Sequence, residues 1–340
     1  MTGSAYKKGL IPDRGMTGRR NTIGDVAGVT VGHVTLSKPD EGLQTGVTVI
    51  RPHGGNVFSE PVPAMVHVGN GYGKFIGLSQ VMELGELETP IAITNTLSAP
   101  EAASGLIDWT LQHNGEARSV NPVVGEINDG KVNAIRERQV RPQHVIEALS
   151  AATADIAEGN VGAGAGGEAY GWKGGVGSSS RVVRLGGKQA TVGVLTVTNI
   201  PGRFAPRGFR ITVSPTLKSN GVAHGSIIMV VATDAPVGPR NLGRMASRSL
   251  LGVARTGSVM PNGSGDYAIA FRAQGCPRSD QPSFELSGDD IPNSAMDPFF
   301  EAVVAASEEA VLNAMVAAET VITSVGQLER YPFPSSAKAY

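Results

Sequence analysis

The sequence predicts an α+β fold in which layered β-sheets are covered by helices. Candidate strands occur in neighbouring runs rather than in strict alternation with helices, which favours layered sheets. Four helical segments lie between these runs. The chain has 340 residues, of which 41% are hydrophobic and 45 are glycine, so we expect a large core and many tight turns.

The strand candidates are short runs rich in β-branched residues and bounded by Gly, Pro, Asn or Asp. They cover residues 26–34, 46–50, 64–68, 91–94, 120–126, 191–198, 208–213, 227–233 and 266–271. The run 227–233 is almost entirely apolar, which is typical of a strand buried on both faces.

The helix candidates carry apolar residues three or four positions apart. They cover residues 101–113, 142–157, 239–253 and 298–320, and the last three begin at a proline, which is favoured in a first helical turn. No polar linker divides the chain, so we expect a single domain over residues 1–340. The glycine-dense segment 159–181 fits a flexible linker or a folded loop, and its Tyr170, Trp172 and Lys173 favour a loop that forms the wall of a site.

Charge and cysteine content exclude several classes of function. Lys and Arg number 29 and Asp and Glu 30, for a net charge of −1, which argues against nucleic acid or an anionic membrane as partner. No window approaches the roughly 20 apolar residues of a membrane span. Cys276 is the single cysteine, so no intrachain disulfide can form and a cytoplasmic location is expected. The six histidines lack metal-ligand spacing, so we expect no metal site.

Gly225 and Ser226 stand directly before the apolar strand 227–233. The pair fits the end of an ordinary loop, but it also fits a bond at which the chain cleaves itself. Cleavage would leave Ser226 at a new N-terminus, where its α-amine, with a reference pKa near 8, could activate the hydroxyl. The glycine would relieve the strain of an N→O acyl shift. His224 lies two residues away and is an alternative partner for Ser226.

A second polar pair, Ser264 and Asp266, lies in the segment NGSGD at the start of the strand 266–271. Period-two alternation puts their side chains on one face of the strand. They therefore fit a short hydrogen-bond relay between a hydroxyl and a carboxylate, or a simple turn that leads into the strand.

Several long motifs together resemble the self-processing aminopeptidases of the DmpA/BapA type, which include L-aminopeptidase/D-amidase-esterase and the β-peptidyl aminopeptidases. The resemblance covers nearly the whole chain and is carried by segments that follow one another in the family's order. They are NTIGDVAGVTVGHVTL (21–36), GNGYGKFIGLSQVMELGELETPIAITNTLS (69–98), NPVVGEINDGKVN (121–133), EGNVGAGAGGEAYGWKGGVGSSSR (158–181), GSIIMVVATDAP (225–236) and GVARTGSVMPNGSGDYAIAF (252–271). The resemblance implies a four-layer αββα sandwich, similar to the N-terminal-nucleophile (Ntn) hydrolases but with distinct connectivity.

The resemblance also implies self-cleavage between Gly225 and Ser226, giving an α chain of residues 1–225 and a β chain of residues 226–340. Ser226 would be the nucleophile, with Ser264 and Asp266 as its relay. These roles predict a serine aminopeptidase that works through an acyl-enzyme and needs no metal or organic cofactor.

Three further residues acquire roles only through the resemblance. Asn199 would be an oxyanion or positioning donor, and Glu126 would bind the free amine of the substrate. Asn128 occupies a place near the site where some members carry an aromatic residue, so the shape of the pocket could differ here. The expected substrates are small peptides, amides or esters of L-α, D or β residues, and the expected assembly is a homo-oligomer, a tetramer of αβ heterodimers.

Two rival interpretations remain open at the level of sequence. One is a related self-cleaving acyltransferase of the ornithine acetyltransferase kind, although those enzymes usually use threonine and their motifs do not match. The other is a non-catalytic, glycine-rich scaffold in which Gly225–Ser226 is only a turn.

Overall fold

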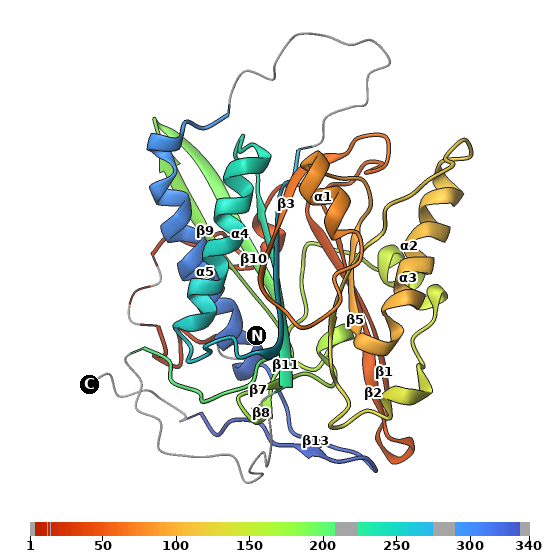
Figure 1. The fold of residues 1–340 in the computed structure, drawn as a ribbon. Helices are drawn as coiled ribbons and strands as arrows, with labels where there is room; N and C mark the ends of the chain where they lie inside the picture. The colour runs from red at the N-terminus through yellow and green to blue at the C-terminus, as the bar shows by residue number, and fades with distance from the viewer. Residues whose placement is uncertain (1–3, 12, 14, 208–223, 275–289, 334–340) are drawn as a thin grey trace.

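The structure, a computed structural model, describes residues 4–11, 13, 15–207, 224–274 and 290–333 (Figure 1). Two sheets dominate it, a four-stranded sheet of order β1-β2-β5-β6 and a six-stranded sheet of order β4-β3-β12-β11-β10-β9. The smaller sheet consists of β1 (Thr30–Lys38), β2 (Leu43–Arg51), β5 (Ile91–Asn95) and β6 (Val123–Ile127). The larger consists of β3 (Val62–Gly71), β4 (Glu86–Leu87), β9 (Val176–Leu185), β10 (Lys188–Asn199), β11 (His224–Thr233) and β12 (Gly263–Arg272).

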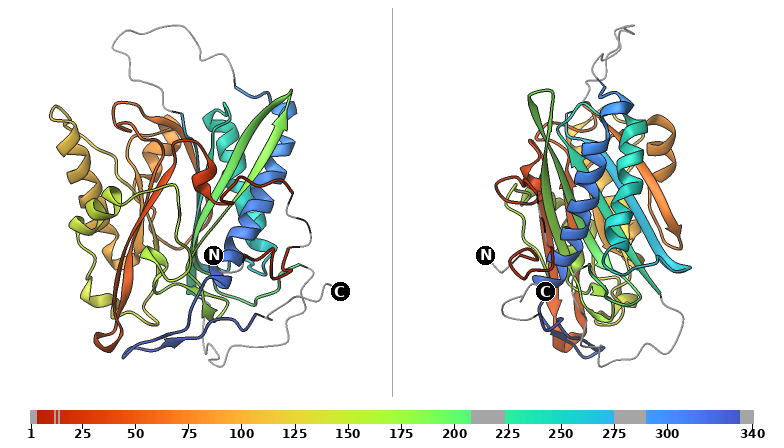
Figure 2. Two further views of the ribbon diagram at one scale, coloured as in Figure 1. Left: turned by 180° about the vertical axis from the view of Figure 1, so that it is seen from behind. Right: turned by 90° about the vertical axis from the view of Figure 1, so that its left-hand side faces the viewer.

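Helices cover the outer face of each sheet. The helices are α1 (Leu78–Leu84), α2 (Ala99–His113), α3 (Pro142–Ser150), α4 (Pro239–Ala254) and α5 (Asp297–Val316). Helices α2 and α3 lie on the four-stranded sheet, and α4 and α5 lie on the six-stranded sheet (Figures 1 and 2). The two sheets face one another, so the layers follow the order αββα, as predicted. No helix among the described residues is long and apolar enough to cross a bilayer.

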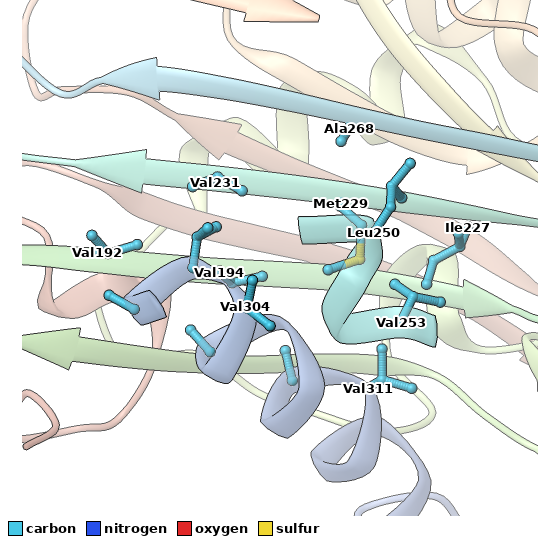
Figure 3. Close-up of a cluster of buried hydrophobic side chains, with 14 of the residues drawn as sticks. Val192, Val194, Ile227, Met229, Val231, Leu250, Val253, Ala268, Val304 and Val311 are labelled. Carbon is cyan, nitrogen blue, oxygen red and sulfur yellow. The ribbon is translucent and has the colours of Figure 1, made fainter. Parts of the chain in front are cut away.

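Side chains of β11 point alternately to the two faces of the sheet, and both faces are buried. Ile227, Met229 and Val231 pack with Leu250 of α4 and Val311 of α5 (Figure 3). The intervening residues of the strand, 228, 230 and 232, pack against the four-stranded sheet. A strand covered by a sheet on one side and helices on the other has an apolar residue at every position, which is the pattern the sequence displays.

Several predicted elements differ in extent from the observed ones. Strand β1 begins at Thr30 rather than at 26, because residues 26–29 form a turn in which Gly28 has φ +90°. Helix α3 ends at Ser150 rather than at 157, because Thr153 leaves the helical path and exchanges two backbone hydrogen bonds with Val31. The predicted strand 208–213 lies outside the described residues.

Strand β9 and helix α1 were not predicted from the sequence. Strand β9 contains three consecutive serines, which obscure its apolar pattern. Each serine is fully buried, and each hydroxyl donates a hydrogen bond: Ser178 to Val194 O, Ser179 to Ala306 O and Ser180 to Asp25 Oδ2. Hydroxyls that are hydrogen-bonded in this way can occupy core positions at little cost, so the polar composition of this segment hides the fact that it is a buried strand.

The glycine-dense segment is a folded loop rather than a linker. It contains the short strands β7 (Glu168–Ala169) and β8 (Trp172–Lys173), which form a small sheet of their own. A Cβ at Gly174 would lie 2.2 Å from Thr198 Oγ1, and a Cβ at Gly167 would lie 2.6 Å from Thr198 O. Glycine is needed there because the loop packs closely against the end of β10. A further two-stranded sheet, β13 (Val321–Ile322) with β14 (Gln327–Leu328), lies near the C-terminus.

Candidate active site

Ser226 lies near the start of β11, between two paired strands. Its Cα partner in the antiparallel strand β10 is Asn199, and its partner in the parallel strand β12 is Gly265. Ser226 is 3% exposed, and its Oγ has no hydrogen-bond partner among the described residues. A buried hydroxyl usually donates a hydrogen bond, so an unpaired one on a rigid strand is a candidate reactive group.

Gly225 cannot be replaced by a larger residue without movement of the backbone around it. A Cβ at this position would lie 2.3 Å from Pro201 Cδ and 2.5 Å from the carbonyl oxygen of Asn199. Both contacts are far shorter than ordinary van der Waals distances. The glycine therefore allows the peptide before Ser226 to lie directly against the end of β10.

Ser264 and Asp266 form the hydrogen-bonded pair that their spacing suggested. Ser264 Oγ donates to Asp266 Oδ1 at 2.7 Å, and both residues are almost completely buried within β12. Asp266 Oδ2 has no hydrogen-bond partner among the described residues. Burial raises the pKa of Asp266 to about 6, while the Ser264 hydroxyl opposes that shift. NGSGD also contains the predicted turn, since Ser264 N–H donates to Pro261 O at 2.9 Å, so the turn and the hydrogen-bonded pair occur together.

The pair and the Ser226 hydroxyl lie on opposite faces of the six-stranded sheet. Ser226 has the same parity in β11 as Ile228, which packs between the two sheets. Ser264 and Asp266 have the same parity in β12 as Ala268, which packs on the side of α4 and α5. Because the strands are adjacent, the pair flanks the main chain of Ser226 rather than its Oγ.

Glu126, at the end of β6, is a buried carboxylate at the edge of the four-stranded sheet. It is 4% exposed, and its Oε1 accepts a hydrogen bond from the backbone N–H of Lys74 at 2.9 Å. Burial raises its pKa, whereas the N–H and the charge of Lys74, together with the Thr96 side chain, oppose the rise.

Residues 71–74 connect Glu126 with the strand that adjoins Ser226. A Cβ on Gly73 would lie 3.0 Å from Glu126 Oε1 and 3.1 Å from Gly265 Cα. Gly265 is the Cα partner of Ser226, and a Cβ there would lie 2.9 Å from the carbonyl oxygen of Tyr72. Two facing glycines thus let this segment cross from one sheet to the other on the face where Ser226 Oγ lies.

The remaining predicted residues occupy different surroundings. Asn199 is 5% exposed and ends β10 beside Ser226. Asn128 is exposed, and its Oδ1 accepts a hydrogen bond from the N–H of Gly130, which fixes the turn after β6. Asp129 is fully enclosed, and its Oδ1 accepts from Asn133 Nδ2 at 2.9 Å. Asn199 is therefore the strand partner of Ser226, Ser264 and Asp266 lie in the neighbouring strand on the face opposite its Oγ, and residues 71–74 lie between Glu126 and that strand.

Sequence reasoning missed the residues that hold Glu126 in place. Lys74 supplies the backbone N–H, and the Tyr267 hydroxyl donates to the carbonyl oxygen of Gly73 at 3.0 Å. The two glycines of GYGK were the available signal, since closely spaced glycines often mark a close backbone approach. His224 begins β11, and the structure describes its backbone.

Known proteins with similar sequences or structures agree on one family. The family model described as peptidase family S58 matches residues 21–328. The beta-peptidyl aminopeptidase BapA of Sphingosinicella microcystinivorans is 37% identical over 338 residues, which cover 92% of this chain and 85% of that protein.

Two solved structures share the fold over nearly the full length. The PH0078 protein from Pyrococcus horikoshii OT3 has a TM-score of 0.88 at 42% identity, covering 97% of this chain and 96% of that chain. The L-aminopeptidase D-Ala-esterase/amidase of Ochrobactrum anthropi, described as a new variant of the Ntn-hydrolase fold, has a TM-score of 0.87 at 32% identity, with the same coverage. With a buried, unpaired serine at the head of the central strand and these matches over the whole chain, the protein belongs to peptidase family S58 and is an aminopeptidase with an Ntn-hydrolase fold.

Proposed function

We propose that the chain cleaves itself between Gly225 and Ser226 and then uses Ser226 to remove N-terminal residues from small peptides, amides or esters. The observation that carries the proposal is the Ser226 hydroxyl, buried and unpaired at the head of β11, with the Ser264–Asp266 pair flanking the main chain of Ser226 on the other face of the sheet. Residues 1–225 and 226–340 would form the two chains of the mature enzyme.

Self-cleavage requires no group from outside except water. Ser226 Oγ attacks the carbonyl carbon of Gly225, the C–N bond breaks, and the hydroxyl proton passes to the Ser226 nitrogen, which leaves a free α-amine and an ester that links Gly225 to Ser226 Oγ. Water then hydrolyses this ester, which releases the Gly225 carboxylate and restores the Ser226 hydroxyl. The absence of a side chain at Gly225 favours the reaction, because its carbonyl can rotate without a Cβ clash against Pro201.

The position of the Ser264–Asp266 pair suits the α-amine that cleavage creates. The pair lies on the face opposite Oγ, so it would orient the amine and handle its proton while Oγ faces the substrate. The amine, acting as general base, would take the proton from Oγ as Oγ attacks the substrate carbonyl. Asn199, the strand partner of Ser226, is proposed to donate to the developing oxyanion, an interaction typically worth a few kcal/mol.

Glu126 is proposed to bind the free amine of the substrate. It shares the face of Ser226 Oγ across residues 71–74, and an ammonium group would offset the cost of burying the carboxylate. The names of the relatives suggest L-α, D or β residues as the released group, since one is a β-peptidyl aminopeptidase and another an L-aminopeptidase D-Ala-esterase/amidase. A homo-oligomer of αβ units in the cytoplasm is the proposed working form.

Two measurements test this proposal in sequence. A denaturing gel of purified protein should contain two fragments, and the smaller should begin Ser-Ile-Ile-Met, whereas Ser226→Ala should remain a single chain. A start at Ser258 or Ser264, which also follow glycine, would contradict the assignment of Ser226.

The second measurement compares one substrate with a free and with an N-acetylated amine. Wild type should release p-nitroaniline from the anilides of L-Ala, D-Ala or a β-homo residue only when the amine is free. Glu126→Gln should lower kcat/KM for the free amine by about one to two orders of magnitude, the value of a buried charge-assisted contact. Equal cleavage of the acetylated substrate by wild type would remove the proposed role of Glu126.

A further inference from the structure

We infer that Tyr267 is a positioning residue for substrate binding, acting through residues 73–74 to hold the Glu126 carboxylate in the orientation that receives the substrate amine. This inference rests on the proposed amine-binding role of Glu126. Its physical basis is a chain of two hydrogen bonds that joins the two sheets. The Tyr267 hydroxyl donates to Gly73 O at 3.0 Å, and the N–H of the next residue, Lys74, donates to Glu126 Oε1 at 2.9 Å.

Tyr267 is itself rigidly held, so it can serve as an anchor. It lies in β12, where it is the Cα partner of Ile228 in β11, and it is 5% exposed. Its ring packs on Phe75 with 5.5 Å between ring centroids. Phe75 is also buried. Tyr267 therefore contacts the residue on each side of Lys74, since its hydroxyl binds Gly73 O and its ring packs on Phe75.

The segment has little freedom to adopt another position. A Cβ at Gly73 would lie 3.0 Å from both Glu126 Oε1 and Tyr267 Cε2. The backbone, the carboxylate and the aromatic ring therefore meet at this point. Without the hydroxyl, Gly73 would lose its only side-chain hydrogen bond among the described residues, and the N–H of Lys74 would no longer be fixed opposite Glu126.

The positioning also affects the protonation of Glu126. The N–H of Lys74 favours the ionised carboxylate and opposes the effect of burial. The charged or titratable groups that act on this carboxylate and its anchor are Lys74, Tyr267 itself and Asp266. A loosened Lys74 would therefore let the pKa of Glu126 rise further, and a higher pH would be needed to bind an ammonium group.

The experiment compares Tyr267→Phe with wild type on an amino-acid p-nitroanilide that has a free amine. The ring remains, so packing on Phe75 is retained. We expect KM to rise about fivefold with kcat nearly unchanged. A fivefold change in binding corresponds to the net free energy of one hydrogen bond. The acid limb of the kcat/KM profile should move to higher pH. Tyr331→Phe is the matched control, since it removes a hydroxyl from another buried tyrosine and should change neither quantity.

A double-mutant cycle separates positioning from a general loss of structure. In a Glu126→Gln background, Tyr267→Phe should have almost no further effect on KM, because the group through which it acts is absent. An additive effect, or a wild-type KM and pH profile in Tyr267→Phe, would overturn the inference. If wild type also cleaves the N-acetylated substrate, it is instead the proposed role of Glu126 that fails.

If Tyr267→Phe does not fold, Gly73→Ala gives a second test from the backbone side. The added Cβ would push against Glu126 Oε1 and Tyr267 Cε2, so the same selective rise in KM is expected. A fall in kcat with unchanged KM would contradict the inference.

Discussion

Asp266 in β12 and Glu308 in α5 are both buried carboxylates, yet their surroundings differ sharply. Glu308 is 2% exposed and accepts two hydrogen bonds from Arg207, at 3.0 and 2.6 Å, with Arg255 at 3.4 Å. Asp266 is 1% exposed and accepts one hydrogen bond from Ser264. Among the described residues no cation lies within ion-pair distance of Asp266, and its Oδ2 is unpaired.

This difference separates a charge that stabilises the fold from one that costs stability. Burying a carboxylate is expensive unless opposite charges and hydrogen bonds replace its water. Two guanidinium groups do this for Glu308. Asp266 retains a raised pKa because nothing comparable offsets its burial, a property common among catalytic groups.

The largest expected effect is on turnover. Asp266→Asn and Ser264→Ala should each lower kcat by at least about 100-fold, the lower end of what positioned proton transfer contributes. Glu308→Gln should leave kcat within about threefold of wild type. Initial rates on a p-nitroanilide, with self-cleavage scored on a gel, measure both effects. Near-normal turnover in Ser264→Ala would contradict the relay.

The effects on stability should be reversed, so that Glu308→Gln, which barely changes turnover, is the variant that destabilises the fold. Glu308→Gln should lower the free energy of unfolding by about 1–2 kcal/mol, because the two partly exposed arginines lose a charged acceptor while the amide still accepts some of the hydrogen bonds. Urea denaturation at pH 7 measures this difference, with Lys38→Ala, which breaks only an exposed ion pair, as a control. A Glu308→Gln protein as stable as wild type would show that the arginines do not stabilise it.

Asp266→Asn should instead stabilise the protein, with a gain that grows between about pH 4 and pH 6 and is complete above that range. The folded pKa of about 6 exceeds the ordinary value of 3.8, so the folded state holds this proton more tightly than the unfolded state. The ionised side chain therefore destabilises the fold as pH rises through this interval, by an amount on the order of 1–3 kcal/mol above pH 6. Thermal unfolding should show the gain of the variant at pH 8 and little gain near pH 4. An equal gain at both pH values would refute an electrostatic origin.

The contrast between these carboxylates was only partly visible in the sequence. Ser264 and Asp266 were identified because period-two spacing in a strand is a local pattern. The strong apolar run of β11 likewise identified the central strand. Local patterns of this kind also carried the prediction of most strands and of the layered α+β class.

The sequence could not reveal contacts made across the sheets. Lys74 reaches Glu126 only because Gly73 and Gly265 let two backbones approach, and no local pattern links these positions. Buried serines hid β9 for a similar reason, since their hydroxyls donate to groups distant in sequence. The assignment of Ser226 and Glu126 depended on the family resemblance, because Gly-Ser before a strand and an acid after one are common.

Glu126 and Asp129, two buried acids near the end of β6, can be compared in the same way as Asp266 and Glu308. Glu126 is held by one backbone N–H beside the segment that faces Ser226. Asp129, three residues later, is 1% exposed and accepts from Asn133, and burial raises its pKa to about 6. The charge of Lys173 opposes that rise, while burial lowers the pKa of this lysine to about 7. Asp129 thus combines features of the other two acids: like Asp266, it has an Oδ2 without a hydrogen-bond partner among the described residues, but Asn133 and the charge of Lys173 also act on it from inside the protein.

The smallest expected effect on activity is therefore that of Asp129→Asn. Because its partners lie within the protein, the change should alter KM for a free-amine substrate by less than about threefold, whereas Glu126→Gln raises it by tenfold or more. Stability at pH 7 should not fall, because burial raises the pKa of Asp129 as it does that of Asp266, and the Lys173 Nζ still donates to Gly164 O and Gly174 O. Steady-state kinetics and urea denaturation on the two variants, prepared side by side, measure the contrast. A large rise in KM for Asp129→Asn, with normal binding by Glu126→Gln, would transfer the amine site to Asp129 and show that internal partners do not exclude a carboxylate from substrate binding.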